Sequence, residues 1–287
     1  MAIIKKNIKK EDFFKNPLFL IILFLLIIIV ILIIRHNSVN SQRKNVMERF
    51  NDEKGELCIT FEQNPTNFII DSKYKEIEVT TFKNCKTLTT IRIPVNIQTI
   101  KYGAFKNCSN LESIYFDKAL SLKNIEALAF SECKNIFRID LPINLENLGD
   151  QVFIGCSRLE IVNLNGKLST IGKETFGRCS SLQSITIPYR VQKINSSTFA
   201  NCTNLVSITF IKYSLLNYIG DLAFNHCVNL ESITFPVNFH SSVKTIRFGE
   251  TPFFDCPKLK TIYNLPKILQ KPFKEAIPDI NFEIKKK

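Results

Sequence analysis

The sequence lacks the short motifs on which most enzymes and metal proteins depend. It contains no Cys-x-x-Cys pair, and its three histidines are scattered at His36, His226 and His240. It also has no serine nucleophile elbow, no phosphate-binding glycine loop and no recurring acid–base pair. These absences predict a protein without catalytic residues, metal ions or cofactors, and therefore not an enzyme.

No basic block is present either, although the formal net charge is +12. Lysine and arginine are interspersed with aspartate and glutamate along most of the chain, which is typical of a solvated face rather than a surface that follows a phosphate backbone. Nucleic acid is therefore not expected as a partner. Attraction to an acidic surface, a glycan or a lipid headgroup stays open.

An apolar run, LFLIILFLLIIIVILII, lies near the N-terminus at residues 18–34. As a helix it would be about 26 Å long, close to the ~30 Å thickness of the hydrocarbon layer. Lys15 and Arg35 flank the run and can reach the headgroups. We therefore expect one transmembrane helix at 18–34, after a basic N-terminal tail at 1–17 and before a polar linker or stalk at 35–55.

A cleaved signal peptide is the alternative interpretation of this run. However, the run is longer than the usual stretch of about 7–15 apolar residues, and no small-x-small cleavage site follows it. Five lysines precede the run and four basic residues follow it closely, a balance that favours a cytosolic N-terminus. The prediction is a single-pass type II membrane protein whose repeat domain is extracellular or lumenal.

The rest of the chain is dominated by the motif Phe-x-x-Cys, which occurs eight times with successive cysteines 23 to 29 residues apart. An apolar residue follows each cysteine at positions +3 and +6, and at +8 in seven of the eight copies. This spacing predicts a short strand in each copy, with +6 and +8 on one side and +5 and +7 on the other. A second apolar pair then brings the chain back to the next copy.

The period predicts a stack of coils, where a coil is one turn of the chain, because a single coil cannot cover its own apolar edges. Equivalent residues are expected to lie above one another, about 4.8 Å apart where strands pair. Phenylalanine and cysteine then form buried structural ladders. The ladder residues include Phe105, Cys108, Phe153, Cys156, Phe176, Cys179, Phe199 and Cys202.

The predicted fold class is an α/β repeat solenoid with short parallel strands and irregular or short helical return segments. Its eight repeats occupy 82–264. An N-terminal cap at 56–81 and a C-terminal cap with a charged tail at 265–287 are expected to protect the two ends of the stack. The longest insertion, around NFHSSVKTIRFGETP, is the best candidate for a special loop.

The nine cysteines fall mainly in the predicted core, so buried free thiols are the favoured interpretation. Ladder neighbours would have Cα atoms about 5 Å apart, a distance that also permits a disulfide. Because in-register side chains lie parallel rather than pointing at each other, at least one disulfide is kept as the alternative.

The copies AFKNCSNLESIYF, FANCTNLVSITF and FGRCSSLQSITIPYRVQKI resemble the BspA-like type of leucine-rich repeat. The resemblance covers Phe82 to about Leu265. It implies a right-handed leucine-rich solenoid, often displayed on the surfaces of bacteria and protists and associated with adhesion to host proteins or other cells. It does not identify a ligand, because such repeats are generic binding scaffolds.

The outward positions +5 and +7 differ along the stack. The first four coils carry varied side chains, whereas coils five to seven repeat serine and threonine, which favour strands for structural reasons. Arginine and tyrosine are favoured at protein interfaces. We therefore predict a ligand-binding surface lined by Arg92, Tyr115, Arg138, Asp140 and Asn163.

Three asparagines, Asn107, Asn195 and Asn201, begin glycosylation triplets that matter only if the domain enters a secretory lumen. An asparagine-rich composition also produces such triplets by chance.

The functional hypothesis is a membrane-anchored, non-catalytic leucine-rich repeat protein that displays a solenoid for adhesion or protein recognition. Its ligand would be a protein or a surface glycan. The alternative is a structural or scaffolding protein of an internal membrane whose solenoid faces the cytosol. The oligomeric state does not follow from the sequence.

Overall fold

The structure is a computed structural model, and it describes residues 27–33, 67–70, 73–116, 121–243, 245–276 and 283–286. The chain divides into two units, residues 1–54 and residues 55–287. Each unit is described by itself below.

In the first unit, residues 27–33 form a helix of exposed isoleucine, leucine and valine side chains. Within the described part of the chain, no helix combines the length and the apolarity needed to cross a bilayer. The remainder of the predicted span at 18–34, the basic tail at 1–17 and the polar stalk at 35–55 lie outside the described residues. Membrane anchoring therefore stays a prediction from sequence.

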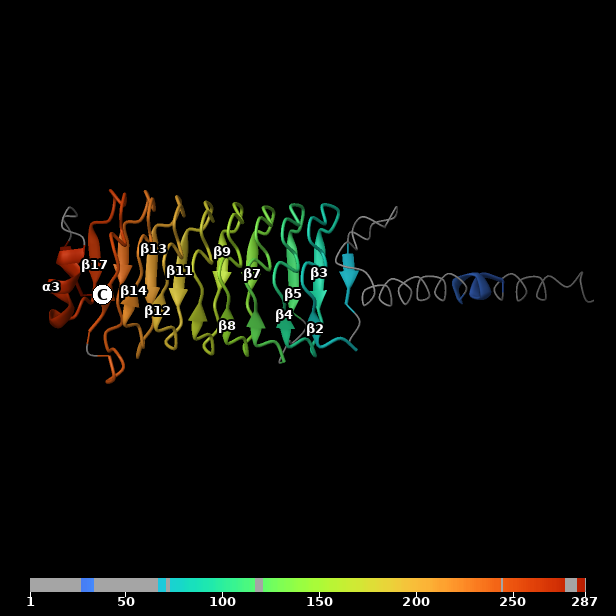
Figure 1. The fold of residues 1–287 in the computed structure, drawn as a ribbon, viewed down its shortest axis with the longest axis horizontal. Coiled ribbons are helices and arrows are strands. Elements are labelled where there is room, and N and C mark those ends of the chain that lie inside the picture. The colour runs from blue at the N-terminus through green and yellow to red at the C-terminus, as the bar shows by residue number, and fades with distance from the viewer. Residues whose placement is uncertain are drawn as a thin grey trace, which may run out of the picture. The chain divides into compact units, whose positions relative to one another are not determined.

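The second unit is a solenoid in which two rows of parallel strands run along the stack (Figure 1). One row consists of the longer strands, and those between residues 90 and 263 are the strands predicted from the repeat. The longer strands are β1 (Asn67–Ile69), β3 (Thr90–Ile93), β5 (Ser113–Phe116), β7 (Arg138–Asp140), β9 (Ile161–Asn163), β11 (Ser184–Ile187), β13 (Ser207–Phe210), β15 (Ser232–Thr234), β17 (Thr261–Tyr263) and β18 (Glu283–Lys285). They form three hydrogen-bonded sheets, β1-β3-β5, β7-β9 and β11-β13-β15-β17-β18.

The register of these sheets confirms that equivalent positions of successive repeats stack. Ser184 pairs with Ser207, and Ser207 pairs with Ser232, so the same position recurs on β11, β13 and β15. The pairing survives the changes in repeat length, because the extra residues lie between strands rather than within them. Within each sheet, neighbouring coils are therefore joined by backbone hydrogen bonds.

The second row lies in the return segments, where the α/β class allowed short helices. Each described return segment instead contains a two-residue strand. These are β2 (Glu76–Ile77), β4 (Thr99–Ile100), β6 (Asn124–Ile125), β8 (Asn147–Leu148), β10 (Thr170–Ile171), β12 (Lys193–Ile194), β14 (Tyr218–Ile219) and β16 (Arg247–Phe248). They pair as β10-β8-β6-β4-β2 and β12-β14-β16, so the fold class is corrected to a parallel β-solenoid. Each short strand makes two register pairs with the strand of the neighbouring coil, as Thr170 and Ile171 do with Asn147 and Leu148.

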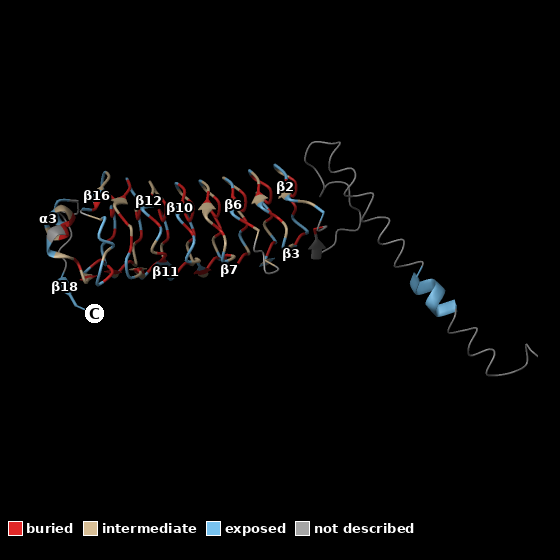
Figure 2. Cartoon of the chain, turned by 90° about the horizontal axis from the view of Figure 1, so that it is seen from below, coloured by how far each residue is buried: buried red, intermediate tan, exposed pale blue. Residues whose placement is uncertain are grey.

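The core lies between the two rows, and Figure 2 shows them along opposite edges of the solenoid. Alternation along β3 illustrates how the sequence fills it, because Ile91 and Ile93 are fully buried whereas Arg92 is exposed. The motif phenylalanines of all eight repeats are also buried. Their rings stack face to face with centroids 4.9–5.7 Å apart and planes within 9° of parallel.

The turn that contains Phe-x-x-Cys, here called the Phe–Cys corner, is also bonded between coils. The backbone N–H of Phe176 donates to the carbonyl of Thr198 in the following coil, at 2.9 Å. The thiol of Cys202 donates to the carbonyl of Phe176 in the preceding coil, at 3.1 Å. Every described motif cysteine from Cys108 to Cys256 makes the same contact with the phenylalanine one coil back.

Seven of the nine cysteines are free and buried, which agrees with the favoured interpretation of the ladder. They are Cys108, Cys133, Cys156, Cys179, Cys202, Cys227 and Cys256. Cys85, at the N-terminal end of the stack, is instead disulfide-bonded, and its partner lies outside the described residues. The alternative of at least one disulfide therefore holds at this position.

The two ends of the solenoid are built differently. Strand β1, from the region predicted as the N-terminal cap, adds to the first row beside β3. At the other end the helix α3 (Lys267–Ala276) places the buried Phe273 ring edge-on against Phe235 and Phe248, with centroids 5.8 and 5.5 Å away. Strand β18 then pairs with β17.

Candidate binding face

The outward side chains of the longer strands form a row along the stack, because equivalent positions pair within each sheet. On β3, β7 and β9 the +5 and +7 positions are half-buried or exposed, while the +6 position between them is buried. The five residues predicted to bind a ligand are all exposed and lie on β3, β5, β7 and β9. We call these five residues, Arg92, Tyr115, Arg138, Asp140 and Asn163, the binding face.

Arg92 and Tyr115 form the first half of the binding face. They are direct partners in the register of β3 and β5, and the guanidinium carbon of Arg92 lies 5.5 Å from the centre of the Tyr115 ring. A cation–π contact of this kind stabilises by about 0.5–1 kcal/mol when exposed. Half of the tyrosine remains accessible, at 51%. The contact therefore orients both side chains and leaves their surfaces available to a partner.

Arg138, Asp140 and Asn163 form the second half. On β7, Nε and Nη2 of Arg138 donate to the two carboxylate oxygens of Asp140, at 2.7 and 2.9 Å. Asn163, the register partner of Asp140 on β9, donates its side-chain N–H to the same carboxylate. The hydrogen bond from Arg138 is the main cause that lowers the pKa of Asp140, and the same bond raises the pKa of Arg138. Both groups therefore keep their charges, and the network is fixed by three hydrogen bonds.

The two halves are neighbours, because β5 and β7 are in contact along the stack although no ladder joins them. The face thus presents a cation on an aromatic ring beside a neutralised ion pair with an amide. These groups can hydrogen-bond and pack against a ligand. Among the described residues, no group of histidine, cysteine and carboxylate side chains is arranged to hold a metal ion.

Comparison with known proteins identifies the family of the repeats that form the solenoid. The family described as the BspA type leucine rich repeat region, with six copies, matches residues 59–182 and 169–276. The chain belongs to this family. The expected resemblance is thereby confirmed, and the match includes most of the predicted caps as well as the repeats.

Two solved structures of leucine-rich repeat proteins are similar to the chain. The leucine rich repeat protein of T. pallidum is 22% identical, with 76% of this chain and 85% of that chain covered and a TM-score of 0.53. A leucine-rich repeat protein from Bacteroides ovatus is also 22% identical, with 79% of this chain and 72% of that chain covered and a TM-score of 0.44. The first likeness shows the fold alone, and no curated protein matches the chain.

The three glycosylation triplets occupy different environments in the BspA-type stack. Asn107 and Asn201 are exposed at Phe–Cys corners. Asn107 donates its side-chain N–H to the side-chain oxygen of Asn84 at 3.0 Å. Asn195 is half-buried, and its side-chain N–H donates to the carbonyl of Ile171 at 2.6 Å. A glycan on Asn195 would break that bond, so Asn107 and Asn201 are the more accessible acceptors.

Lys193 and Arg247 are further candidate functional residues that the repeat pattern did not mark. They lie on the short strands β12 and β16 and line a pocket with the loop that follows β15. The length of that loop was a signal in the sequence, since it is the longest insertion. The cations themselves carried no signal, because single lysine and arginine residues in return segments look like ordinary solvated residues.

Proposed function

We propose that this BspA-type repeat protein is a non-catalytic, single-pass membrane protein whose solenoid recognises a protein partner through the binding face. The observation that supports this proposal most directly is the arrangement of Arg92, Tyr115, Arg138 and Asp140. These four side chains are exposed, yet each is held by a neighbour on the same or an adjacent strand. Arginine and tyrosine are the side chains that most often dominate protein interfaces.

Preorganisation is the physical reason why such a face suits recognition. Ordering a long side chain on binding costs about 0.5–1.5 kcal/mol, and a side chain already held in place pays less of this cost. The Arg138 side chain remains about half exposed, at 51%, although two of its guanidinium nitrogens bond to Asp140. It can therefore donate to a partner without first being ordered.

The outward side chains of the strands nearer the C-terminus offer less contact area to a protein partner. Thr186 on β11 is exposed, but the equivalent Thr234 on β15 is 9% accessible. Short hydroxyl side chains on neighbouring strands provide little area for contact. This contrast favours the N-terminal half of the row as the recognition surface.

Membrane anchoring is supported by the apolar run at 18–34 and by its flanking basic residues. The topology in which the solenoid is extracellular or lumenal makes the binding face available for adhesion to another cell or to a soluble protein. Protease digestion of sealed membranes tests this topology. In sealed vesicles whose cytosolic side faces the protease, an extracellular or lumenal solenoid is protected from digestion. A solenoid that is digested in the same vesicles faces the cytosol, which establishes the scaffolding alternative.

Site-specific photo-crosslinking tests the recognition surface in the full chain. A benzophenone amino acid replaces Tyr115 in one variant and Thr186 in the control, since both positions are exposed in the same row. We expect a discrete cross-linked product from position 115 that weakens when Arg92 and Arg138 are also changed to alanine. The proposal is wrong if position 186 gives the same product, or if the product from 115 is insensitive to both substitutions.

A further inference from the structure

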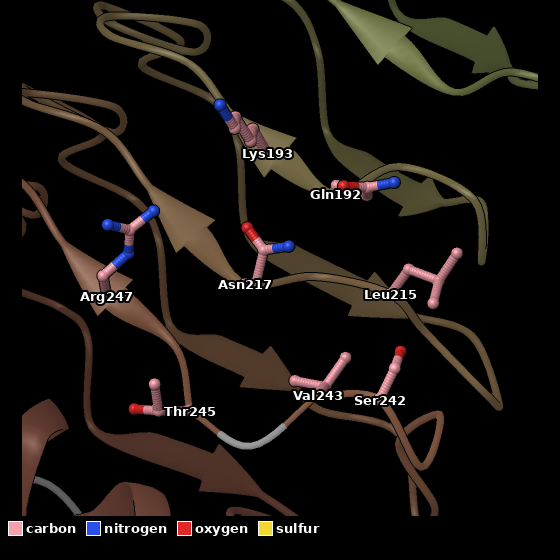
Figure 3. Close-up of a pocket in the computed structure, with 8 residues that line it drawn as sticks. All are labelled: Gln192, Lys193, Leu215, Asn217, Ser242, Val243, Thr245 and Arg247. Atoms are coloured by element: carbon pink, nitrogen blue, oxygen red, sulfur yellow. The ribbon is translucent and has the colours of Figure 1, made fainter.

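A pocket lies beside the row of short strands, away from the binding face. Its volume is about 390 Å³, and Figure 3 shows the side chains that line it. Small-molecule sites in proteins have volumes of roughly 300–1,000 Å³, so the pocket can take a small ligand or the end of a chain. A folded protein partner is too large for it.

The longest coil builds one wall of this pocket. The extra residues between β15 and β16 extend along the short strands, and hydrogen bonds to the preceding coil fix their position. The N–H of His240 donates to the carbonyl of Ser214 at 3.2 Å, and the N–H of Tyr213 donates to the carbonyl of Asn238 at 2.8 Å. A β-bridge joins Ser214 to Phe239. These contacts attach this wall of the pocket to the preceding coil of the stack.

Two cations stand on the floor of the pocket. Lys193 on β12 and Arg247 on β16 occupy the same register position, and Tyr218 of β14 occupies it between them. Two strand spacings place their Cα atoms about 10 Å apart, so their long side chains can reach a common anion. Among the described residues neither cation forms an ion pair, and both are exposed. The positive charge of the pocket is thus not neutralised by the protein.

The remaining lining is rich in amides and hydroxyls and contains no aromatic ring. Gln192, Asn217 and Ser242 provide donors and acceptors, while Leu215 and Val243 provide small apolar patches.

We propose that this pocket binds an acidic saccharide, with a carboxylate or sulfate held between Lys193 and Arg247. Sugar hydroxyls pair with the amide and hydroxyl side chains, and the carbon face of the ring packs on Leu215 and Val243. An inorganic anion would use only the cations. An acidic peptide would use the cations and the amides, but its acidic side chains offer no carbon ring face to Leu215 and Val243. The saccharide is the ligand that uses every kind of group in the lining.

Titration calorimetry on the full chain in detergent micelles tests the proposal. The probes are sialyllactose, which carries a carboxylate, a sulfated chondroitin disaccharide, and lactose as the neutral control. We expect at least one acidic probe to bind at least tenfold more tightly than lactose, with an affinity that falls as salt is raised. The two acidic probes distinguish a carboxylate from a sulfate. A glutamate hexapeptide that binds as tightly as the acidic sugars overturns the proposal. The proposal is also overturned if neither acidic probe binds.

Matched variants assign any binding to the pocket. We expect Lys193→Gln combined with Arg247→Gln to weaken the acidic probe at least tenfold. Lys83→Gln combined with Lys173→Gln removes the same charge from exposed positions outside the pocket and should leave the affinity unchanged. If both double variants lose the same affinity for the acidic probe, the effect comes from the net charge of the protein, and the proposed site is wrong. Arg92→Ala on the binding face should not alter saccharide binding, so this test and that of the protein-recognition surface fail independently.

Discussion

The sulfur of Cys179 lies 3.3 Å from the carbonyl oxygen of Phe153, which belongs to the coil before it. The same carbonyl accepts the backbone N–H of Cys156, at 3.1 Å. Both lone pairs of this buried oxygen therefore have donors, one from its own coil and one from the next. Cysteine at this position both fills a small space in the core and satisfies a carbonyl that would otherwise lack its second partner. This role explains why the corner repeats cysteine rather than alanine.

Thiol ionisation should make the solenoid sensitive to alkali. Burial raises the pKa of the Cys202 thiol to about 12, and burial is also the main cause that raises the pKa of Cys179. A folded-state pKa above the unfolded value of about 8.5 gives stability that is present below that pH and lost as the pH rises toward 12. Each such thiol should remove about 1.4 kcal/mol from the free energy of unfolding per pH unit in this window.

Cys202→Ala isolates this effect from the ionisation of tyrosine and lysine. The variant should be less stable than the wild type at pH 7, because it loses the thiol donor and leaves a small cavity. Its deficit should shrink by about 2 kcal/mol between pH 8.5 and pH 10, since only the wild type carries that thiol. Urea denaturation at each pH measures the difference, and a constant deficit would contradict the prediction.

Alkylation should count the cysteines in two steps. The native solenoid should resist iodoacetamide at pH 8, because the seven free thiols are buried. After unfolding without reductant we expect seven alkylated cysteines, and after reduction all nine. Intact-mass spectrometry counts them. Nine modifications without reductant would show that Cys85 is not disulfide-bonded.

Loss of a stacked ring should be much more damaging than loss of an outward side chain. Phe176 is fully buried between Phe153 and Phe199, whereas Thr186 is exposed on β11. We expect Phe176→Ala to cost about 3–5 kcal/mol of unfolding free energy. Thr186→Ala should cost less than about 1 kcal/mol, as is usual for surface positions. Similar melting temperatures for the two variants would argue against the buried ladder.

A glycine that follows the second row should be essential for close stacking. A Cβ atom at Gly172 would lie 2.4 Å from the backbone carbon and oxygen of Gly149 in the preceding coil. A Cβ atom at Gly166 would have no neighbouring atom within 4 Å. Gly172→Ala should therefore destabilise by at least about 1–3 kcal/mol, the usual cost of overpacking. Gly166→Ala should be neutral, and thermal melts of the two variants provide the comparison.

Backbone strain at the Phe–Cys corner should be relieved by glycine. Glu174 has a φ of +52°, and the fourth residue after it, Arg178, has a φ of +60°. Replacement of Glu174 by glycine should stabilise by about 1 kcal/mol, because glycine adopts this region without a steric penalty. Lys173→Gly, at an adjacent position without positive φ, should destabilise by about 0.5–1 kcal/mol. A melting temperature that falls in both variants would indicate that the strain is offset elsewhere.

The repeat spacing was sufficient to predict the stack, the strands β3 to β17 of the first row and the inward direction of phenylalanine and cysteine. This succeeds because a period-two alternation and a fixed repeat length leave one arrangement that buries every apolar position. The same pattern did not reveal the short strands such as β12 and β14. Two residues are too few to display a period, and only the neighbouring coils supply their hydrogen-bond partners.

The sequence by itself determined the repeat, the buried ladders and the row from which Arg92, Tyr115 and Arg138 project. The tertiary structure decided which of these side chains meet. Arg92 reaches Tyr115 and Asn163 reaches Asp140 only because register places residues 23 positions apart on adjacent strands. It also decided that Lys193 and Arg247 share a pocket, since that proximity depends on how the longest coil folds back on the stack. Local spacing encodes direction, whereas contact between coils is a property of the packed solenoid.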